Sequence, residues 1–252
     1  MCSVDNTKAI LEKAWLWVLL YIAAILYSVP LARSLQKLIY ATVGKEFYTY
    51  VVFFSVFVCL AAAIYSLIFK YRVKNVSQYF WLLLCAGLYM YFTIQLGEHP
   101  EEAVHFVEYG VLTYFFFRAL SVKVRDWTIY VTVLLFVLFV GTVDEFIQWM
   151  MPGRFWDYRD VRNDALAGAI FLIAVLKGIR PEIISGPVKK FSLKILAGIL
   201  IANMIFLGLC LANTPDMVKR YTSVFESLSW LRDEEPMTEF RLFRDAPIDE
   251  NR

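Results

Sequence analysis

Apolar residues gather along this chain in seven long blocks, and shorter polar segments separate them. Each block is close to the length that lets a helix cross about 30 Å of hydrocarbon. Helices are expected because lipid cannot satisfy the backbone groups of an open strand edge, and the blocks lack the alternation of a membrane barrel. The predicted spans are 14–31, 49–69, 79–96, 104–120, 127–149, 164–178 and 194–212.

Residues 1–212 are therefore predicted to form one all-α domain, a polytopic transmembrane helix bundle of about seven spans. The composition agrees, because 60% of the residues are hydrophobic, whereas soluble proteins average about 45–50% apolar residues. The first block is predicted to be a retained helix. Asp5 and Glu12 dilute the basic region that a cleavable signal needs, and no small-residue cleavage site follows.

Residues with special backbone or side-chain properties refine the picture of the spans. Pro30 is predicted to end or kink the first span, because proline removes a helical hydrogen bond. Asp160 or Asn163 is predicted to cap the sixth helix, since both residue types accept hydrogen bonds from free backbone donors. Four glycines are predicted to permit close packing of helices: Gly87, Gly168, Gly198 and Gly208.

Residues 213–252 differ in character from the bundle. Val218, Tyr221, Phe225 and Leu228 recur at helical spacing with charged residues between them. This pattern predicts a short amphipathic helix that lies on the membrane surface. The polar sequence that follows is predicted to be disordered.

Lysine and arginine are distributed unevenly among the loops. The N-terminus and the loops near 70–78, 118–126 and 177–194 carry about twice as many as the loops on the other side of a seven-span bundle. Because cytoplasmic loops are enriched in positive residues, the N-terminus is predicted to be cytoplasmic. The loops 97–103 and 150–163 and the C-terminal tail would then lie outside the cell membrane. The net charge of +2 identifies no partner, and no nucleic acid is expected.

One polar segment, 98–109, contains both histidines of the chain, His99 and His105. On a helix, His105, Glu108 and Tyr109 share one stripe. Ionisable groups at the edge of a bilayer are costly and tend to be retained for a function. This segment is therefore a candidate site.

A second polar segment, 144–164, follows the fifth span. Asp144 and Gln148 are four residues apart and Glu145 and Gln148 three apart, so their side chains can be neighbours on a helix. Both segments are predicted to reach the same face of the membrane and to line one cavity. The remaining polar candidates of this segment are Arg154, Asp157, Asp160 and Asp164.

Three interpretations of these residues stay open. The polar groups can pair with one another and fix the geometry of the helix ends. They can also bind a ligand, because arginine binds phosphate or carboxylate at two points and nearby aromatic residues add stacking surface. Such a site suits a lipid-linked or glycosylated headgroup. The candidate binding residues are Tyr109, Asp144, Gln148, Arg154, Asp157, Asp160 and Asp164.

The third interpretation is catalysis, in which a histidine beside a carboxylate acts as a general base. His105, Glu108 and Glu145 are the catalytic candidates if the protein is an enzyme, which the sequence leaves open. His105 and Glu108 also have a spacing that metal ligands use, but His-x-x-Glu alone is a weak signal. No metal is assigned, and the cofactor is unknown.

Two segments resemble the motifs of the VanZ-like family of membrane proteins, over about 98–176. The first motif, His-Phe followed shortly by Tyr in a helix, is similar to EHPEEAVHFVEYGVLTYFFFRAL. The second is similar to DEFIQWMMPGRFWDYRDVRNDALAG, although the family's usual Asn falls on Asp164, with Asn163 just before it. The matched residues are His105, Phe106, Glu108, Tyr109, Asp144, Glu145, Gln148, Gly153, Arg154, Asp157 and Asp160.

The resemblance implies a polytopic membrane protein of bacterial type. The family's namesake is associated with low-level resistance to a glycopeptide antibiotic that acts on the cell envelope. We therefore expect an outward-facing polar pocket that binds an envelope headgroup, with an effect on glycopeptide susceptibility. The alternative is a membrane-embedded hydrolase or transferase that acts on an envelope lipid with the same residues.

Overall fold

The chain folds into helices joined by turns, and no strand occurs in the part that the structure describes. The computed structural model describes residues 2–96, 102–152, 154, 156–233 and 237. The predicted all-α fold is confirmed for these residues. The elements are α1 (Cys2–Thr42), α2 (Phe47–Tyr65), η1 (Ser66–Lys70), α3 (Val76–Gln95), α4 (Glu102–Leu120), α5 (Thr128–Trp149), α6 (Tyr158–Ile173), η2 (Ala174–Ile179), α7 (Lys190–Ala212), α8 (Pro215–Val224) and η3 (Glu226–Arg232).

Four helices among the described residues are long and apolar enough to cross a membrane, which indicates a membrane protein. They correspond to the first, second, fifth and seventh predicted spans. The helices α3, α4 and α6 do not belong to this group, and charged residues such as Glu108 and Asp164 interrupt the apolar pattern of α4 and α6. The four segments are Glu12–Ala32, Phe47–Lys70, Thr128–Trp149 and Lys190–Ala212.

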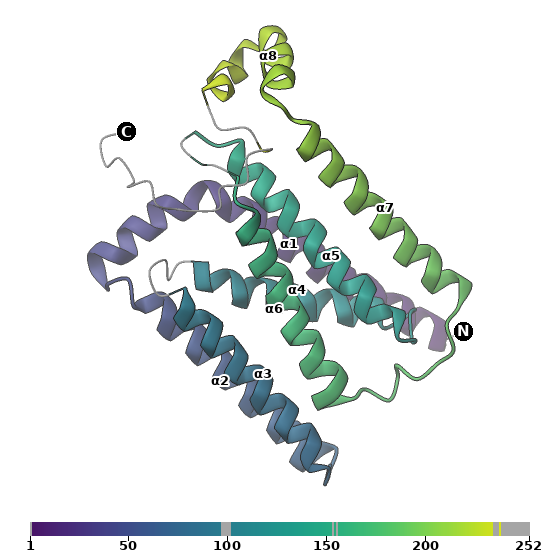
Figure 1. The fold of residues 1–252 in the computed structure, drawn as a ribbon. Helices are drawn as coiled ribbons and strands as arrows, with labels where there is room; N and C mark the ends of the chain where they lie inside the picture. Colours follow the sequence, from purple (N-terminus) through teal and green to yellow (C-terminus); the bar gives the residue numbers. More distant parts are fainter. Residues whose placement is uncertain (1, 97–101, 153, 155, 234–236, 238–252) are drawn as a thin grey trace.

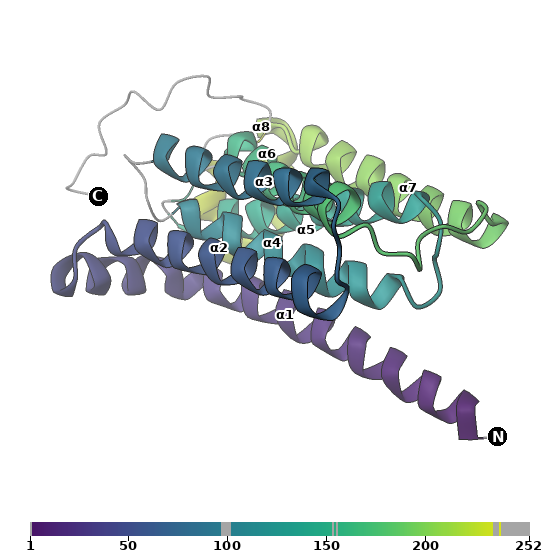
Figure 2. The ribbon, with the colours of Figure 1, turned by 90° about the horizontal axis from the view of Figure 1, so that it is seen from below.

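Helix α4 lies at the centre of the bundle, where it packs against α1, α2, α5 and α6 (Figure 1). Its buried residues Phe106, Tyr109, Leu112 and Phe116 recur at helical spacing and form part of the main apolar core. Helix α1 runs along one side of the bundle (Figure 2). Trp15 of α1 meets Phe116 edge to face, with ring centroids 5.6 Å apart. This contact holds the second half of α4 against α1.

Helices α5 and α7 lie side by side and run in the same direction (Figure 1). Near their starts, the Ser192 hydroxyl donates a hydrogen bond to an Asp126 carboxylate oxygen at 2.6 Å. Halfway along, the Asn203 amide donates to the Leu135 carbonyl at 3.0 Å. The two helices therefore end on the same side of the bundle.

Asp126, in the turn before α5, anchors the start of α7. Its side chain is buried and accepts hydrogen bonds from Ser192 and from the backbone N–H and hydroxyl of Thr128. Burial raises the pKa of this carboxyl, but the hydrogen bonds outweigh burial and hold the pKa below its usual range. Its contribution to stability is therefore complete above the unfolded-state pKa of about 4 and is lost as pH falls through the lower folded-state pKa.

We expect Asp126→Asn to lower the free energy of unfolding by about 1–3 kcal/mol at pH 7, because hydrogen bonds to a buried charge are lost. The loss should shrink as the pH falls below about 4, where the wild-type carboxylate also becomes protonated. Denaturant unfolding of the purified chain in detergent measures both effects. Asp216→Asn, at an exposed position on α8, is the matched control. Equal stability of Asp126→Asn and wild type at pH 7 would contradict the prediction.

Two sequence predictions about special residues are wrong in part. Helix α1 continues through Pro30 to Thr42, so this proline does not end the helix. Gly168 packs closely, since an added Cβ would lie 3.1 Å from both the Thr113 hydroxyl and a Val137 methyl group. The other three predicted packing glycines have no such neighbour, because an added Cβ would meet nothing within 4 Å. These are Gly87, Gly198 and Gly208.

The sixth helix begins earlier than predicted, at Tyr158, and its N-cap is Asp157 rather than Asp160 or Asn163. The Asp157 backbone is extended, and its carboxylate accepts a hydrogen bond from the Arg159 N–H at 2.9 Å. The polar residues that follow Asp157 therefore form the first turn of α6. Asp164, farther along the same helix, is buried in the bundle.

The C-terminal segment forms the predicted amphipathic helix over a shorter stretch, as α8 followed by η3. Val218 and Leu231 are buried in one apolar cluster with Trp149 of α5 and Cys210 of α7, so part of the apolar face packs on protein. Phe225 follows the end of α8 and is exposed. The predicted disorder falls mostly on 234–236 and 238–252, outside the described residues.

Candidate functional site

The start of α4, the end of α5 and the start of α6 meet at one end of the bundle. The Tyr109 hydroxyl on α4 donates a hydrogen bond to an Asp144 carboxylate oxygen on α5 at 3.2 Å, and both residues are buried. The predicted meeting of the two polar segments is therefore confirmed. We call the following residues the polar cluster: His105, Glu108, Tyr109, Asp144, Glu145, Gln148, Arg154, Asp157, Asp160 and Asp164.

His105 and Glu108 form the more open part of the polar cluster. Their side chains are 32% and 29% exposed, and His105 Nδ1 lies 3.4 Å from Glu108 Oε2. The helical spacing of three residues brings them onto one stripe, as predicted. His105 Nδ1 is itself buried and has no hydrogen-bond partner among the described residues. One edge of the imidazole is thus accessible, and one nitrogen faces inward.

Asp144 and Asp164 form the buried floor of the polar cluster. Tyr109 and Gln148 both donate to Asp144 Oδ2, at 3.2 and 3.4 Å. Asp144 Oδ1 and Asp164 Oδ1 are buried and have no hydrogen-bond partner in the described part of the chain. The two carboxylates lie within electrostatic range of each other. Buried acceptors without donors are rare and costly, so each calls for an explanation such as a bound group.

Gly141 creates the space that Asp164 occupies. An added Cβ on Gly141 would lie only 2.9 Å from Asp164 Oδ2, so α5 and α6 approach closely at this level. Gly141 lies one helical turn before Asp144, on the same face of α5. The glycine thus lets the Asp164 carboxylate enter the interface beside the first acid of α5.

Glu145 faces the turn between α5 and α6. Its Oε1 atom accepts a hydrogen bond from the backbone N–H of Asp157 at 2.7 Å, and Asp157 in turn caps α6. Glu145 therefore fixes the turn, which is a positioning role. Asp160 lies within electrostatic range of Glu145 and Asp164, and the half-buried Arg154 within range of Asp144.

The polar cluster brings together every candidate side chain that the sequence predicted within the described residues. His99 and Gly153 lie outside them. No group of three His, Cys, Asp or Glu side chains in the described ranges is arranged to hold a metal ion. The chemistry that the cluster offers is acceptance of hydrogen bonds at its floor and proton transfer at the His105–Glu108 pair.

Sequence reasoning missed three residues that shape this site. Gly141 shares a helical face with Asp144, but this spacing alone does not show that Asp164 lies against it. The Thr113 hydroxyl donates to the Tyr109 carbonyl at 2.6 Å, one turn deeper in α4. Tyr21, on α1, lies within electrostatic range of Glu108, and no sequence pattern marks that approach.

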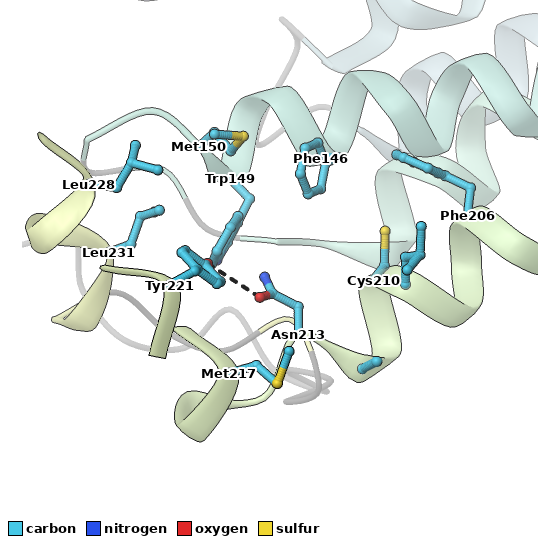
Figure 3. Close-up of a pocket in the computed structure, with 12 residues that line it drawn as sticks. Phe146, Trp149, Met150, Phe206, Cys210, Asn213, Met217, Tyr221, Leu228 and Leu231 are labelled. Carbon is cyan, nitrogen blue, oxygen red and sulfur yellow. Dashed lines mark hydrogen bonds between the residues drawn. The ribbon is translucent and has the colours of Figure 1, made fainter. Parts of the chain in front are cut away.

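A cavity of about 340 Å³ lies at the ends of α5 and α7, under the C-terminal segment (Figure 3). It is lined mainly by apolar residues such as Phe146 and Trp149, whereas the cavity predicted from the sequence was polar and lined by both polar segments. No family model, curated protein or solved structure matches this chain.

Proposed function

We propose that this membrane protein binds the headgroup of an envelope lipid in the polar cluster, through hydroxyl or amino groups of the ligand. One observation carries the proposal: Asp144 Oδ1 and Asp164 Oδ1 are buried acceptors with no donor in the described part of the chain. A sugar hydroxyl or an ammonium group would supply the missing donors.

The exposed fractions of the side chains in the polar cluster support entry of a headgroup from the end of the bundle. His105 and Glu108 are about a third exposed, whereas Asp144 and Asp164 are buried. A ligand would first meet the histidine pair and then reach the acidic floor. Arg154, which lies within electrostatic range of Asp144, offers a second contact for a phosphate of the same headgroup.

A second candidate function is a membrane-embedded hydrolase or transferase. The specific observation in its favour is the pair of His105 Nδ1 and Glu108 Oε2, 3.4 Å apart. A carboxylate beside a histidine orients the ring and increases its basicity, so the pair could activate water or a ligand hydroxyl. In that case the acidic floor would hold the substrate while His105 takes the proton.

Incubation of the purified full chain with a total membrane lipid extract tests both candidates. We expect wild type to retain one lipid class saturably, as measured by mass spectrometry, without a new product. Wild type could instead form a new product that His105→Ala does not form, although this variant still retains the lipid. That result would show an enzyme rather than a binding protein. If the folded double variant Asp144→Asn, Asp164→Asn retains the same lipids as wild type, both candidates fail, because both place the ligand on the acidic floor.

We further propose that α3, α4 and α6 with η2 also cross the membrane, giving seven spans. They contain 20, 19 and 22 residues, the last being 16 in α6 plus 6 in η2. At about 1.5 Å per residue, each reaches about 30 Å, the thickness of the hydrocarbon core. Buried placement of Asp164 supports this, because intramembrane charges face the interior of a bundle.

The polar cluster and the C-terminal segment are proposed to lie outside the cell membrane, with the N-terminus in the cytoplasm. The excess of lysine and arginine at the opposite end supports this orientation. The resemblance to the VanZ-like family would make the ligand a component of the bacterial envelope and would connect its binding to glycopeptide susceptibility.

Labelling from outside the cell tests the orientation. In a cysteine-free chain, Asp216→Cys on α8 should react with a membrane-impermeant maleimide in intact cells. Lys74→Cys, exposed at the opposite end of the bundle, should react only after lysis. The reverse pattern would place the polar cluster in the cytoplasm and exclude an outer-leaflet ligand.

A further inference from the structure

The cavity under the C-terminal segment is a separate feature from the polar cluster. Its volume of about 340 Å³ falls in the range of small-ligand sites, about 300–1,000 Å³. Phe146 and Trp149 of α5, Phe206 and Cys210 of α7, and Leu231 of η3 contribute to its walls (Figure 3). The α5 residues come from the last turns of a candidate span, as do the α7 residues. If these helices cross the membrane as proposed, the cavity lies at the edge of the hydrocarbon layer.

Two polar side chains of the cavity wall, Tyr221 and Asn213, pair with each other. The Tyr221 hydroxyl donates a hydrogen bond to Asn213 Oδ1 at 3.3 Å, and Figure 3 shows this pair at the wall. Asn213 Nδ2 donates to the Met237 sulfur at 3.3 Å. The Tyr221 hydroxyl and the Asn213 amide are thus already engaged within the protein. The surface that remains is aromatic and aliphatic, and cavities of this kind stay dry or take up hydrocarbon.

The rim of the cavity is continuous with the lipid-facing surface of α7. Leu209, in the cavity wall, is 63% exposed, and Ile205, one turn earlier on the same face, is 60% exposed. Both belong to the candidate span Lys190–Ala212. The molecules that reach this face within a bilayer are lipids, so a chain can enter the cavity sideways without crossing water.

We propose that the cavity binds one hydrocarbon chain of a membrane lipid, with α8 and η3 as its cover. Val218 and Leu231 hold the cover in place, because both are buried against the ends of α5 and α7. The site does not depend on the headgroup function proposed above. Trp156, buried in the same apolar cluster, precedes Asp157, whose N–H binds Glu145. The chain site and the polar cluster are thus neighbours across one turn.

Photocrosslinking of a lipid chain tests the proposal. The full chain is reconstituted in vesicles of phosphatidylethanolamine and phosphatidylglycerol that contain trace phosphatidylglycerol with a diazirine in mid-chain. After irradiation, adducts are mapped by peptide mass spectrometry. We expect adducts on the cavity walls to exceed severalfold those at Phe54, a lipid-facing residue of α2 that is 70% exposed. Equal labelling at both places would overturn the proposal.

Variants that fill the cavity make the test specific. Cys210→Trp places an indole inside the cavity, and Leu209→Trp places one at its exposed rim, where folding is easier to preserve. Both should reduce labelling of the cavity walls severalfold. Ile205→Trp adds the same side chain to α7 outside the cavity and should leave the labelling unchanged. If the cavity walls are labelled equally in Leu209→Trp and Ile205→Trp, the lipid chain lies on the surface of α7 and the cavity is not its site.

Discussion

Replacing Gly141 with valine is expected to abolish retention of the headgroup and to destabilise the bundle. A Cβ at this position would lie 2.9 Å from Asp164 Oδ2 and 3.3 Å from Asp164 Cβ, and Asp164 is buried. The carboxylate cannot turn into solvent, so α5 and α6 must separate. Overpacking of this kind costs about 1–3 kcal/mol. Thermal unfolding in detergent and lipid retention by mass spectrometry measure the two effects.

Gly198→Val is the matched control for this prediction. Gly198 lies inside α7, another candidate span, and an added Cβ there would meet nothing within 4 Å. The same β-branched residue in a helix interior therefore carries the same propensity cost without the clash. If both variants lose equal stability and retain lipid equally, the close approach at Gly141 has no role in the site.

The double variant Asp144→Asn, Asp164→Asn is expected to lose the headgroup while keeping its stability. Asparagine preserves the shape of each side chain but removes the charge and replaces one acceptor oxygen with a donor nitrogen. Each lost hydrogen bond to a charged group is worth about 1.5–3 kcal/mol, which corresponds to at least about a tenfold weaker affinity per residue. Both carboxylates are buried and incompletely paired, so removing their charge should leave the stability of the fold unchanged or increase it.

This combination of weaker binding and unchanged stability separates a ligand site from a structural network. If the carboxylates only held the helices together, the double variant would unfold at a lower temperature than wild type. Titration of the retained lipid into the detergent-solubilised chain gives the affinity, and thermal unfolding gives the stability. Asp216→Asn, at an exposed position on the same end of the molecule, should change neither quantity.

The helices of this protein were predictable because span length and apolarity are local properties. The predicted block 127–149 became α5, Thr128–Trp149, and the block 194–212 became α7, Lys190–Ala212. The meeting of the polar segments was also predictable in outline. Two helices joined by a short turn run antiparallel, so the start of α4 and the end of α5 must lie at one end of the bundle.

Contacts between helices were not predictable, because no local pattern specifies them. The start of α6 was misplaced since Asp157 caps the helix through a bond to Arg159 N–H, and Asp160 and Asn163 are equally good capping types. Gly141 was missed for a related reason. A glycine reveals its role only when the opposing side chain is known, and here that side chain is Asp164, on another helix.

The C-terminal segment illustrates the same limit. Its helical spacing identified an amphipathic helix, but the amphipathic pattern is identical for a helix on lipid and a helix on protein. Burial of Val218 in an apolar cluster with Trp149 and Cys210 shows the contact with protein, which the pattern alone did not reveal. The apolar cavity depends on this packing, so the sequence alone gave no sign of it.

A crystal structure of the full chain purified together with its native membrane lipids tests the central claim most directly. We expect a lipid headgroup whose hydroxyl or amino groups lie within hydrogen-bonding distance of Asp144 Oδ1 and Asp164 Oδ1, near the His105 ring. Hydrogen bonds from these two oxygens only to ordered water or to other groups of the protein would contradict it.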